Sequence, residues 1–322
     1  MSAALTDPVG RTIVIAFGGN AMSRPGDKPG IESQFRRAYE AMAFVAGLVA
    51  DGVHVVLTHG NGPVVGDILL RGEAAREIIP PMPLYIADAD SEGGIGLMLQ
   101  QTLGNSLRRR GVVVPIATVV TQVVVAANDP AFENPTKPIG PYFPRDQAEL
   151  LAAERGWQIV EEPGRGWRRV VPSPRPQRIV ETPAVRALVK AGVVAIAAGG
   201  GGVPVVEDVH GQLTGIDAVV DKDWASAVLA AEISAEAFVI LMEADAVYEG
   251  WGTPQQRRLD RLTPAEAQVL LDSGALSVGS IGPKVGAASW FASKTGKDAL
   301  ICRGEDLTAA LSGRAGTRFS VT

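Results

Sequence analysis

The stretch Thr12-Ile13-Val14-Ile15-Ala16-Phe17-Gly18-Gly19-Asn20 decides the fold. Its first part is apolar and β-branched, which is typical of a strand buried on both faces of a parallel sheet. Two glycines then end the run. In residues 31–51 the apolar side chains recur every three or four positions, which predicts a helix with one buried face. The chain therefore opens with a strand, a glycine turn and a helix.

The same order of elements is repeated further along the chain. Residues 53–58 form a second apolar run, which His59-Gly60-Asn61-Gly62-Pro63 ends. Further strands are predicted at 112–117, 119–125, 193–198, 237–242 and 299–302, the last of these being the final core strand, and helices at 93–110, 184–191, 224–232, 264–274 and 284–293. Strands that alternate with helices indicate an α/β fold with a doubly wound, mostly parallel sheet.

Residues 129–176 break this pattern. They are rich in Pro, Gly, Arg and aromatic residues, as in Asn134-Pro135-Thr136-Lys137-Pro138 and Gly164-Arg165-Gly166-Trp167-Arg168. A plain surface loop of this length is uncommon in a compact domain, whereas lids and small subdomains are often this long. We therefore expect one domain over residues 1–322 with a protruding subdomain inserted at 129–176.

Composition excludes several classes of protein. The 322 residues are 46% hydrophobic with a formal net charge of −5, which argues against a disordered chain and against a duplex-DNA binder. Cys302 is the single cysteine, so neither an internal disulfide nor a zinc site of four cysteines can form, and it ends an apolar strand as a core residue. The sequence has neither a long apolar run nor a secretory leader. We expect a soluble, cytoplasmic protein.

Three glycine clusters follow predicted strands. They are Gly18-Gly19-Asn20, Gly60-Asn61-Gly62 and Gly199 through Gly202. In open α/β sheets ligands bind beyond the carboxyl ends of the strands, where glycine lets backbone N–H groups approach a phosphate. Any one cluster could be an ordinary turn that needs a positive φ. The three together predict a shared anion site.

Common nucleotide-binding signatures are absent from the sequence. No string matches the P-loop, and the turn after the first strand lacks the Gly-x-Gly-x-x-Gly of dinucleotide sites. The His-Arg-Asp and Asp-Phe-Gly motifs of protein kinases are missing as well. A hydride-transfer enzyme and a protein kinase are therefore both disfavoured.

Three lysines stand in constrained settings. Lys137 is held between Thr136 and Pro138, Lys222 lies between two acids in Asp221-Lys222-Asp223, and Lys284 follows Pro283 near a helix start. Phosphoryl transfer needs fixed positive charges around the group that is transferred. Most lysines are simply solvated, but a cation near a helix start is disfavoured unless an anion lies close by. The three lysines are therefore candidate phosphate ligands.

These segments, in this order and approximate spacing, resemble the carbamate kinases of the amino acid kinase superfamily. The most specific parts are Asn-Pro-Thr-Lys-Pro-Ile-Gly-Pro at 134–141 and Gly-Arg-Gly-Trp-Arg at 164–168. The resemblance runs from about Thr12 to Thr322. It implies a three-layer αβα sandwich, usually in a homodimer, with residues 129–176 as a lid over the substrate.

The resemblance also implies an activity. Carbamate kinases transfer a phosphoryl group reversibly between ATP and carbamate with Mg²⁺, and the catabolic direction of arginine metabolism makes ATP from ADP and carbamoyl phosphate. We expect the phosphates of the nucleotide to hold the magnesium, because the sequence shows no grouping of acidic, His or Cys residues with metal-ligand spacing. Neither nucleic acid nor a membrane is expected as a partner.

The resemblance assigns roles to individual residues of this sequence. Lys137 would reach from the lid to the acceptor, Lys222 and Lys284 would hold nucleotide phosphates, and Asp223 would position these lysines. Asp245 and Tyr248 would lie beside the nucleoside. The residues around the acceptor and the transferred phosphoryl group would be Gly18, Gly19, Asn20, Gly60, Asn61, Gly62, Gly200 and Gly201. His59 is interpreted as structural, since carbamate is already anionic and needs no base.

The chain departs from carbamate kinases at two places near the expected site. Ser91-Glu92-Gly93-Gly94-Ile95-Gly96-Leu97 stands where that family commonly has Thr-Gln-Gly, a small residue and Ile-Gly-Tyr. Met242 replaces a threonine at the end of a strand. An anionic Glu92 would repel an anionic substrate unless a cation offset it. Two alternatives therefore stay open: a kinase for another small carbamate or carboxylate, and a nucleotide-binding relative without catalysis.

Overall fold

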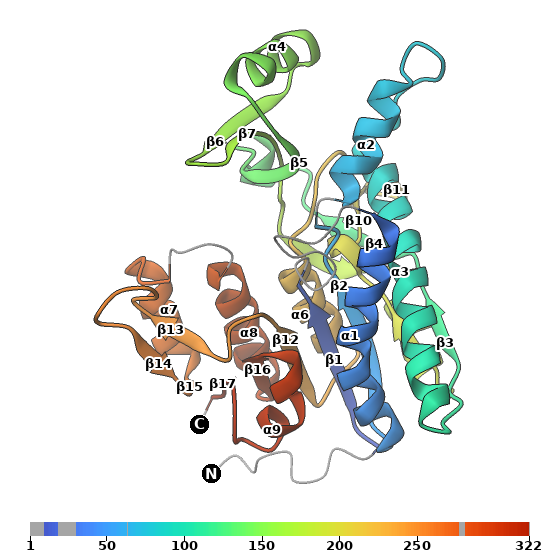
Figure 1. Cartoon of the computed structure of the whole chain (residues 1–322), viewed down its shortest axis with the longest axis vertical. Coiled ribbons are helices and arrows are strands. Elements are labelled where there is room, and N and C mark those ends of the chain that lie inside the picture. Colours follow the sequence, from blue (N-terminus) through green and yellow to red (C-terminus); the bar gives the residue numbers. More distant parts are fainter. Residues whose placement is uncertain (1–9, 19–29, 63, 277–280, 322) are drawn as a thin grey trace.

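The computed structural model describes residues 10–18, 30–62, 64–276 and 281–321. An eight-stranded sheet forms its centre, in the order β15-β17-β16-β12-β1-β2-β9-β3 (Figure 1). Every neighbouring pair is parallel except β16 and β17. The strands are β1 (Thr12–Phe17), β2 (His54–His59), β3 (Ile116–Thr118), β9 (Val194–Ile196), β12 (Ala237–Leu241), β15 (Arg261–Leu262), β16 (Asp298–Cys302) and β17 (Thr317–Phe319).

Helices cover both faces of this sheet. Alternation along β1 explains why: Val14 and Ala16 pack into one buried cluster, while Ile13, Ile15 and Phe17 pack into another. The first cluster includes side chains of α5, α6, α7 and α8, and the second includes side chains of α1, α3 and α9. The predicted α/β fold with three αβα layers is confirmed. The helices are α1 (Ile31–Ala50), α3 (Leu84–Arg109), α5 (Thr182–Lys190), α6 (Lys222–Glu232), α7 (Pro264–Asp272), α8 (Ile281–Thr295) and α9 (Leu307–Leu311).

Some predicted boundaries were wrong. The helix predicted from residue 93 is α3, which begins at Leu84. The turns before residue 93 carry Asp88 and Glu92 on their buried side. A search for regularly spaced apolar residues does not detect a buried face that is made of acids. Cys302 ends β16 as predicted, but β16 is not the last strand of the core sheet, because β17 follows it as a short antiparallel neighbour. At Thr263 the expected helix start is present as a capping box with Glu266.

A second sheet lies beside the central one. Its order is β11-β10-β4-β8, and Val124 and Val205 pair within it. It contains the C-terminal part of the strand predicted at 119–125. The elements are β4 (Gln122–Val125), β8 (Pro176–Ile179), β10 (Val203–Glu207) and β11 (Leu213–Gly215). A separate hairpin is formed by β13 (Val247–Glu249) and β14 (Arg257–Leu259).

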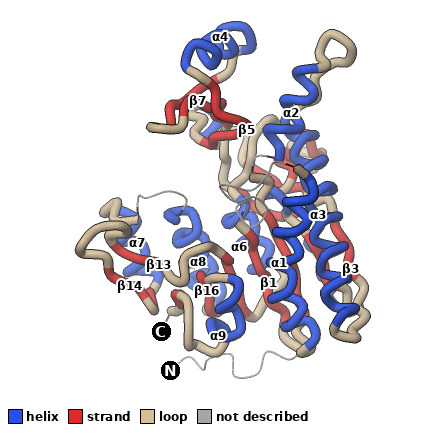
Figure 2. The backbone as a smooth tube through the Cα atoms, in the orientation of Figure 1, coloured by secondary structure: helices blue, strands red, loops and turns tan. Residues whose placement is uncertain are grey.

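The segment that broke the sequence pattern stands away from the body beside α2 (Val64–Ala74), as Figures 1 and 2 show. It is a three-stranded antiparallel sheet, ordered β5-β7-β6, with one helix. Its elements are β5 (Lys137–Phe143), α4 (Arg145–Arg155), β6 (Gln158–Glu162) and β7 (Gly166–Val171). At its base Ile139 and Val171 pack with Val65 and Leu84 of the body.

Short 3-10 helices complete the described chain at η2 (Pro130–Phe132), η3 (Gly199–Gly201) and η4 (Gly304–Asp306). Within the described ranges, no helix has the length and hydropathy needed to cross a bilayer.

Candidate active site

Two glycine turns meet where the carboxyl ends of neighbouring strands come together. Strands β12, β1, β2 and β9 are adjacent and parallel, so the turns after them share one edge of the sheet. The backbone N–H of Gly60 donates to the carbonyl of Phe17 at 3.2 Å, which ties the turn after β2 to the end of β1. Gly18 lies beside the end of β12, since an added Cβ there would be 3.6 Å from the carbonyl oxygen of Leu241. Gly19 and Asn20 lie outside the described residues.

The turn after β9 packs against the turn after β2. An added Cβ on Gly199 would lie 2.4 Å from His59 Nε2, and one on Gly200 would lie 2.9 Å from Asn61 Nδ2. Gly201 has φ +104° and its added Cβ would lie 2.1 Å from the carbonyl oxygen of Val220, the residue before the N-cap of α6. Only glycine fits there. The predicted turns are therefore brought together beside the N-terminus of α6.

At this N-terminus two predicted lysines share one carboxylate. Lys222 Nζ lies 2.5 Å from Asp223 Oδ1, and Lys284 Nζ lies 3.2 Å from Asp223 Oδ2. Asp223 is only 2% exposed, and α8 brings Lys284 to it from 61 residues further along the chain. Burial, with a contribution from the neighbouring charge of Lys284, lowers the pKa of Lys222, while Asp223 opposes the shift. Asp223 thus contacts both ammonium groups at once.

The third lysine reaches the same place from the protruding segment. Lys137 Nζ lies 2.9 Å from Asp221 Oδ2, and the other oxygen of Asp221 caps α6 by accepting from the N–H of Asp223 at 3.0 Å. Burial alone would raise the pKa of Asp221, but the ammonium of Lys137, with those of Lys222 and Lys284, lowers it to about 2. Three ammonium groups and two carboxylates leave one positive charge at a helix N-terminus, a favourable place for an anion.

Beneath the glycine turns lies a cluster of buried polar side chains. His59, Asp88 and Glu92 are each 1% exposed. Asp88 accepts from Asn61 Nδ2 at 3.3 Å, and Glu92 Oε2 accepts from the N–H of Thr121 at 2.8 Å. Three buried atoms of this cluster have no hydrogen-bond partner among the described residues: His59 Nε2, Asp88 Oδ2 and Glu92 Oε1.

Burial disfavours the charged forms of the side chains in this cluster. It lowers the pKa of His59 to about 4; a hydrogen bond to Gly60 opposes this shift and the charge of Lys222 adds to it. Burial raises the pKa of Asp88, helped by Asp217, and it also raises that of Glu92, against the hydrogen bond from Thr121. His59 Nδ1 faces the carbonyl of Gly60 at 3.3 Å, so the neutral ring is protonated on Nδ1. Burial therefore favours the neutral form of Glu92, and this form does not repel an anionic substrate.

The other departures face elsewhere. Leu97 is 58% exposed on α3, and Met242 packs against the core while its N–H donates to Cys302 at 2.9 Å. Cys302 is buried, as expected, and burial raises the pKa of its thiol to about 12. Neither departure places a polar group at the lysine cluster.

The two predicted nucleoside residues lie in a different part of the site. Tyr248 Oη donates to Asp245 Oδ1 at 2.9 Å, and Asp245 is paired with Arg258. The ring of Tyr248 meets that of Trp251 edge-on, with centroids 5.1 Å apart. These contacts belong to the β13–β14 hairpin, and none of them joins the pair to the lysines.

Sequence reasoning missed Asp88 as a site residue and gave Asp221 only the role of orienting Lys222. A signal existed for Asp221, since Asp-Lys-Asp before a helix is an N-cap pattern. Asp88 lies in the first turns of α3, before the predicted helix start at residue 93. The described residues contain no group of three His, Cys, Asp or Glu side chains able to hold a metal ion.

Comparison with known proteins places this geometry in a family. The sequence pattern of the amino acid kinase family matches residues 11–303. The carbamate kinase of Thermococcus kodakarensis is 44% identical over 311 residues, covering 96% of this chain and 98% of its own, and the carbamate kinase-like protein YahI of Escherichia coli is 44% identical over 313 residues, covering 96% and 99%. The structure of Giardia lamblia carbamate kinase bound to AMP-PNP superimposes with a TM-score of 0.89 at 38% identity, covering 98% of this chain and 99% of that one.

The family pattern spans far more than half of the chain, and these relatives match over nearly their full lengths. The chain belongs to the amino acid kinase family, and within it to the group of carbamate kinases and their close relatives.

Proposed function

We propose that this protein is a carbamate kinase, an ATP-dependent transferase that moves a phosphoryl group reversibly between ATP and carbamate. One observation carries the proposal: Lys137, Lys222 and Lys284 converge on the two aspartates at the N-terminus of α6, beside the glycine turns. The full-length relatives named carbamate kinase support the same activity.

The reaction suits a site built from fixed charges. A carboxylate oxygen of carbamate attacks the γ-phosphorus and the bond to the β-phosphate oxygen breaks, so no proton has to leave the acceptor. A neutral, buried His59 agrees with a reaction that needs no base. Lys222 and Lys284 would neutralise nucleotide phosphates, and Gly60, Asn61, Gly62, Gly200 and Gly201 would surround the transferred group with backbone donors.

We also assign the parts that complete the site. Gly18, Gly19 and Asn20 would face the acceptor from the turn after β1, and Asp245 and Tyr248 would lie beside the nucleoside. Mg²⁺, when bound, supplies further positive charge to the phosphates. Because no described group of side chains suits a resident metal, we assign the ion to the nucleotide. ATP binding is supported by the AMP-PNP complex of the Giardia lamblia relative.

We regard residues 1–322 as one domain with residues 129–176 inserted as the lid. The tie between Lys137 at the foot of β5 and Asp221 supports this division, because it joins the inserted segment to the body at the site itself. Closing such a lid would exclude water from the transferring group. Cytoplasmic location and a place in arginine metabolism belong to the same proposal.

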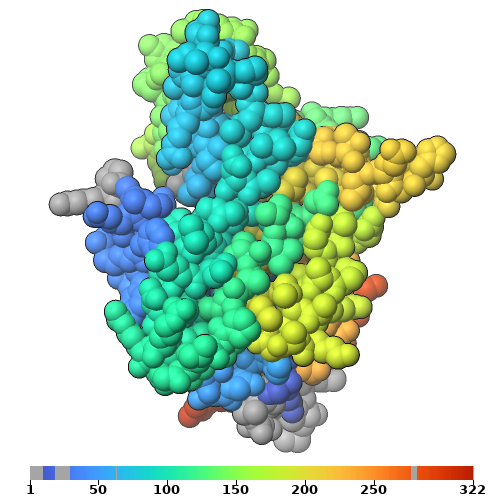
Figure 3. All heavy atoms as spheres, turned by 90° about the vertical axis from the view of Figure 1, so that its right-hand side faces the viewer, coloured from blue at the N-terminus to red at the C-terminus, as the bar shows by residue number. Residues whose placement is uncertain are grey.

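A homodimer is part of the proposal as well. Figure 3 faces α2 and α3, which together with the link between them carry five exposed large apolar side chains. Apolar surface of this kind commonly marks contacts between proteins. The exposed large apolar side chains of these two helices and of the link between them are Leu70, Ile78, Ile79, Ile86 and Leu97. Light scattering behind a sizing column would measure the mass, and a mass of 33.6 kDa would refute the dimer.

The activity is tested by coupling ATP formation from ADP and carbamoyl phosphate to a spectrophotometric readout. We expect turnover that requires Mg²⁺ and carbamoyl phosphate. Replacing carbamate by acetate or another small carboxylate in the ATP-consuming direction distinguishes the alternative acceptors. Nucleotide binding without turnover in either direction would identify a non-catalytic relative and refute the proposal.

A further inference from the structure

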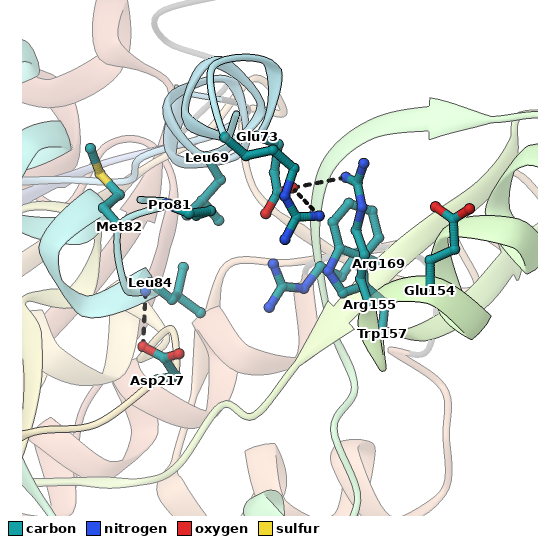
Figure 4. A pocket seen from close by; sticks show the side chains of 11 residues that line it. Leu69, Glu73, Pro81, Met82, Leu84, Glu154, Arg155, Trp157, Arg169 and Asp217 are labelled. Atoms are coloured by element: carbon teal, nitrogen blue, oxygen red, sulfur yellow. Dashed lines mark hydrogen bonds and ion pairs between the residues drawn. The ribbon is translucent and has the colours of Figure 1, made fainter. Parts of the chain in front are cut away.

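A pocket of about 400 Å³ lies between the protruding segment and the body, away from the lysine cluster (Figure 4). None of its lining residues has been assigned a part in catalysis or substrate binding above. Body residues form one side and residues of α4, β7 and the turn after α4 form the other. A volume of this size suits a small metabolite. The residues that line it and carry the argument are Leu69, Glu73, Met82, Arg155, Trp157, Arg169 and Asp217.

On the side of the protruding segment, an aromatic ring holds two guanidinium groups. The guanidinium carbon of Arg155 lies 5.3 Å from the ring centroid of Trp157, and that of Arg169 lies 5.0 Å from it. A cation over an aromatic face is attracted by the ring and loses rotational freedom. Trp157 therefore fixes both side chains at the wall of the pocket before any ligand arrives.

The arginines of this wall differ in whether an acidic side chain pairs with them. Glu73 lies 3.2 Å from Arg155 and 3.5 Å from Arg76, so one carboxylate serves both of them. The guanidinium of Arg169 has neither a hydrogen bond nor an ion pair with any described residue, and Figure 4 shows it directed into the pocket. Burial lowers the pKa of Arg169, while Asp217 and Glu73 oppose the shift from a distance. The planar fork of Arg169 is thus available to a carboxylate or phosphate.

The opposite wall offers a negative group and an apolar surface. Asp217 Oδ1 accepts from the N–H of Leu84 at 2.8 Å, which fixes the carboxylate, and its side chain remains exposed to the pocket. Leu69, Met82 and Leu84 provide the apolar lining between this carboxylate and the arginine side. Glu154 is exposed at the rim and adds a further negative charge there.

We propose that this pocket binds a small zwitterion of the amino acid class, with its carboxylate on Arg169, its ammonium on Asp217 and its side chain against Leu69 and Met82. A ligand with only a negative charge would be repelled by the carboxylate of Asp217. A ligand with only a positive charge would be repelled by the guanidinium of Arg169. A zwitterion satisfies both groups at once. Because Arg169 belongs to the protruding segment and Asp217 to the body, the occupant bridges the two.

Three probes that differ by one charged group test this assignment by titration calorimetry at pH 7.5. They are L-norleucine, hexanoate, which lacks its ammonium, and pentylamine, which lacks its carboxylate. We expect L-norleucine to bind at least tenfold more tightly than either of the others. Arg169→Gln should weaken L-norleucine at least tenfold and make it resemble pentylamine, whereas Asp217→Asn should make it resemble hexanoate.

Controls separate this result from a loss of folding and from the proposed activity. Arg145→Gln removes an exposed arginine of α4 that does not line the pocket, and all three affinities should persist. Circular dichroism melts would show that the variants are folded. The binding test does not depend on turnover, so a failed kinase assay leaves it intact. No binding of L-norleucine to the unaltered protein up to 20 mM, or an affinity for L-norleucine that both pocket variants retain unchanged, would overturn the proposal.

Discussion

Lys137, the first residue of β5, places its ammonium 2.9 Å from Asp221, the N-cap residue of α6. The pair joins the protruding segment to the N-terminus of α6, where Lys222 lies and to which α8 brings Lys284. The side chain of Lys137 is 33% exposed and that of Asp221 is 19% exposed, so water screens the ion pair only in part. An incoming anionic acceptor would compete with Asp221 for this ammonium, and the same side chain can therefore serve both the resting contact and the reaction.

Replacing Lys137 by methionine tests this role. Lys137→Met keeps most of the length of the side chain and removes the charge, so a developing negative charge on the acceptor would lose its partner. Removal of one such group typically costs about a hundredfold or more in turnover. We expect kcat/KM for carbamoyl phosphate to fall by about this factor while the melting temperature changes little. Lys190→Met, at an exposed lysine that ends α5, is the matched control and should be silent. Comparable activity of the two variants would remove Lys137 from the mechanism.

The buried acid Glu92 gives a prediction about pH. Burial raises its pKa above the ordinary value of 4.5, so its neutral form is the one that the fold favours. Its contribution to stability is then fully present below about pH 4.5 and is lost as the pH rises through the elevated pKa. Glu92→Gln keeps the shape and an acceptor for the N–H of Thr121, but it cannot ionise.

We therefore expect Glu92→Gln to unfold at a higher urea concentration than the unaltered protein at pH 8, by about 1 kcal/mol or more, and to converge with it near pH 5. Turnover should be retained, since a glutamine is what carbamate kinases commonly carry at this point. Glu77→Gln, at an exposed position, controls for the general loss of one negative charge. A variant that is weaker than the unaltered protein at pH 8 would mean that Glu92 is needed as an anion.

Where α2 meets the protruding segment, two glycines are in close backbone contact. A Cβ added to Gly66 would lie 2.1 Å from the Cα of Gly140, and both partners are backbone, so neither can turn aside. Gly66→Ala should therefore push β5 away from α2 and destabilise the protein by about 1–3 kcal/mol in urea unfolding. It should also raise the KM for carbamoyl phosphate through Lys137.

Gly72→Ala is the control for this variant, because it lies in the same helix and its added Cβ would meet nothing within 4 Å. Helix propensity predicts that this change is neutral or stabilising by up to about 1 kcal/mol. Equal stability of the two variants would mean that the contact between Gly66 and Gly140 is not rigid.

The sequence predicts an element of this structure well when the residues that the element buries are apolar. The runs at Thr12–Phe17 and Ala237–Leu241 are buried on both faces and read as strands without ambiguity. Glycine turns after such strands, and the two acids beside Lys222, were equally recognisable in the sequence. The start of α3 was not, because its inward face carries Asp88, Ser91 and Glu92, and only tertiary burial makes these residues interior ones. The pocket around Trp157 depends on how two units pack, for which no local pattern exists.

The shared carboxylate of Asp223 supports the last prediction, which concerns the two lysines that it holds. Asp223→Asn removes the carboxylate that contacts both Lys222 and Lys284, so the two ammonium groups lose the charge that they share. Breaking a buried pair from one side typically costs about 3–5 kcal/mol. Mg-ATP should recover part of this loss, because its phosphates supply the missing negative charge. Thermal melts with and without 5 mM Mg-ATP measure the effect, with the exposed Asp146→Asn as control. If the nucleotide shifts the melting temperature of Asp223→Asn no more than it shifts that of the control, the two lysines do not hold its phosphates.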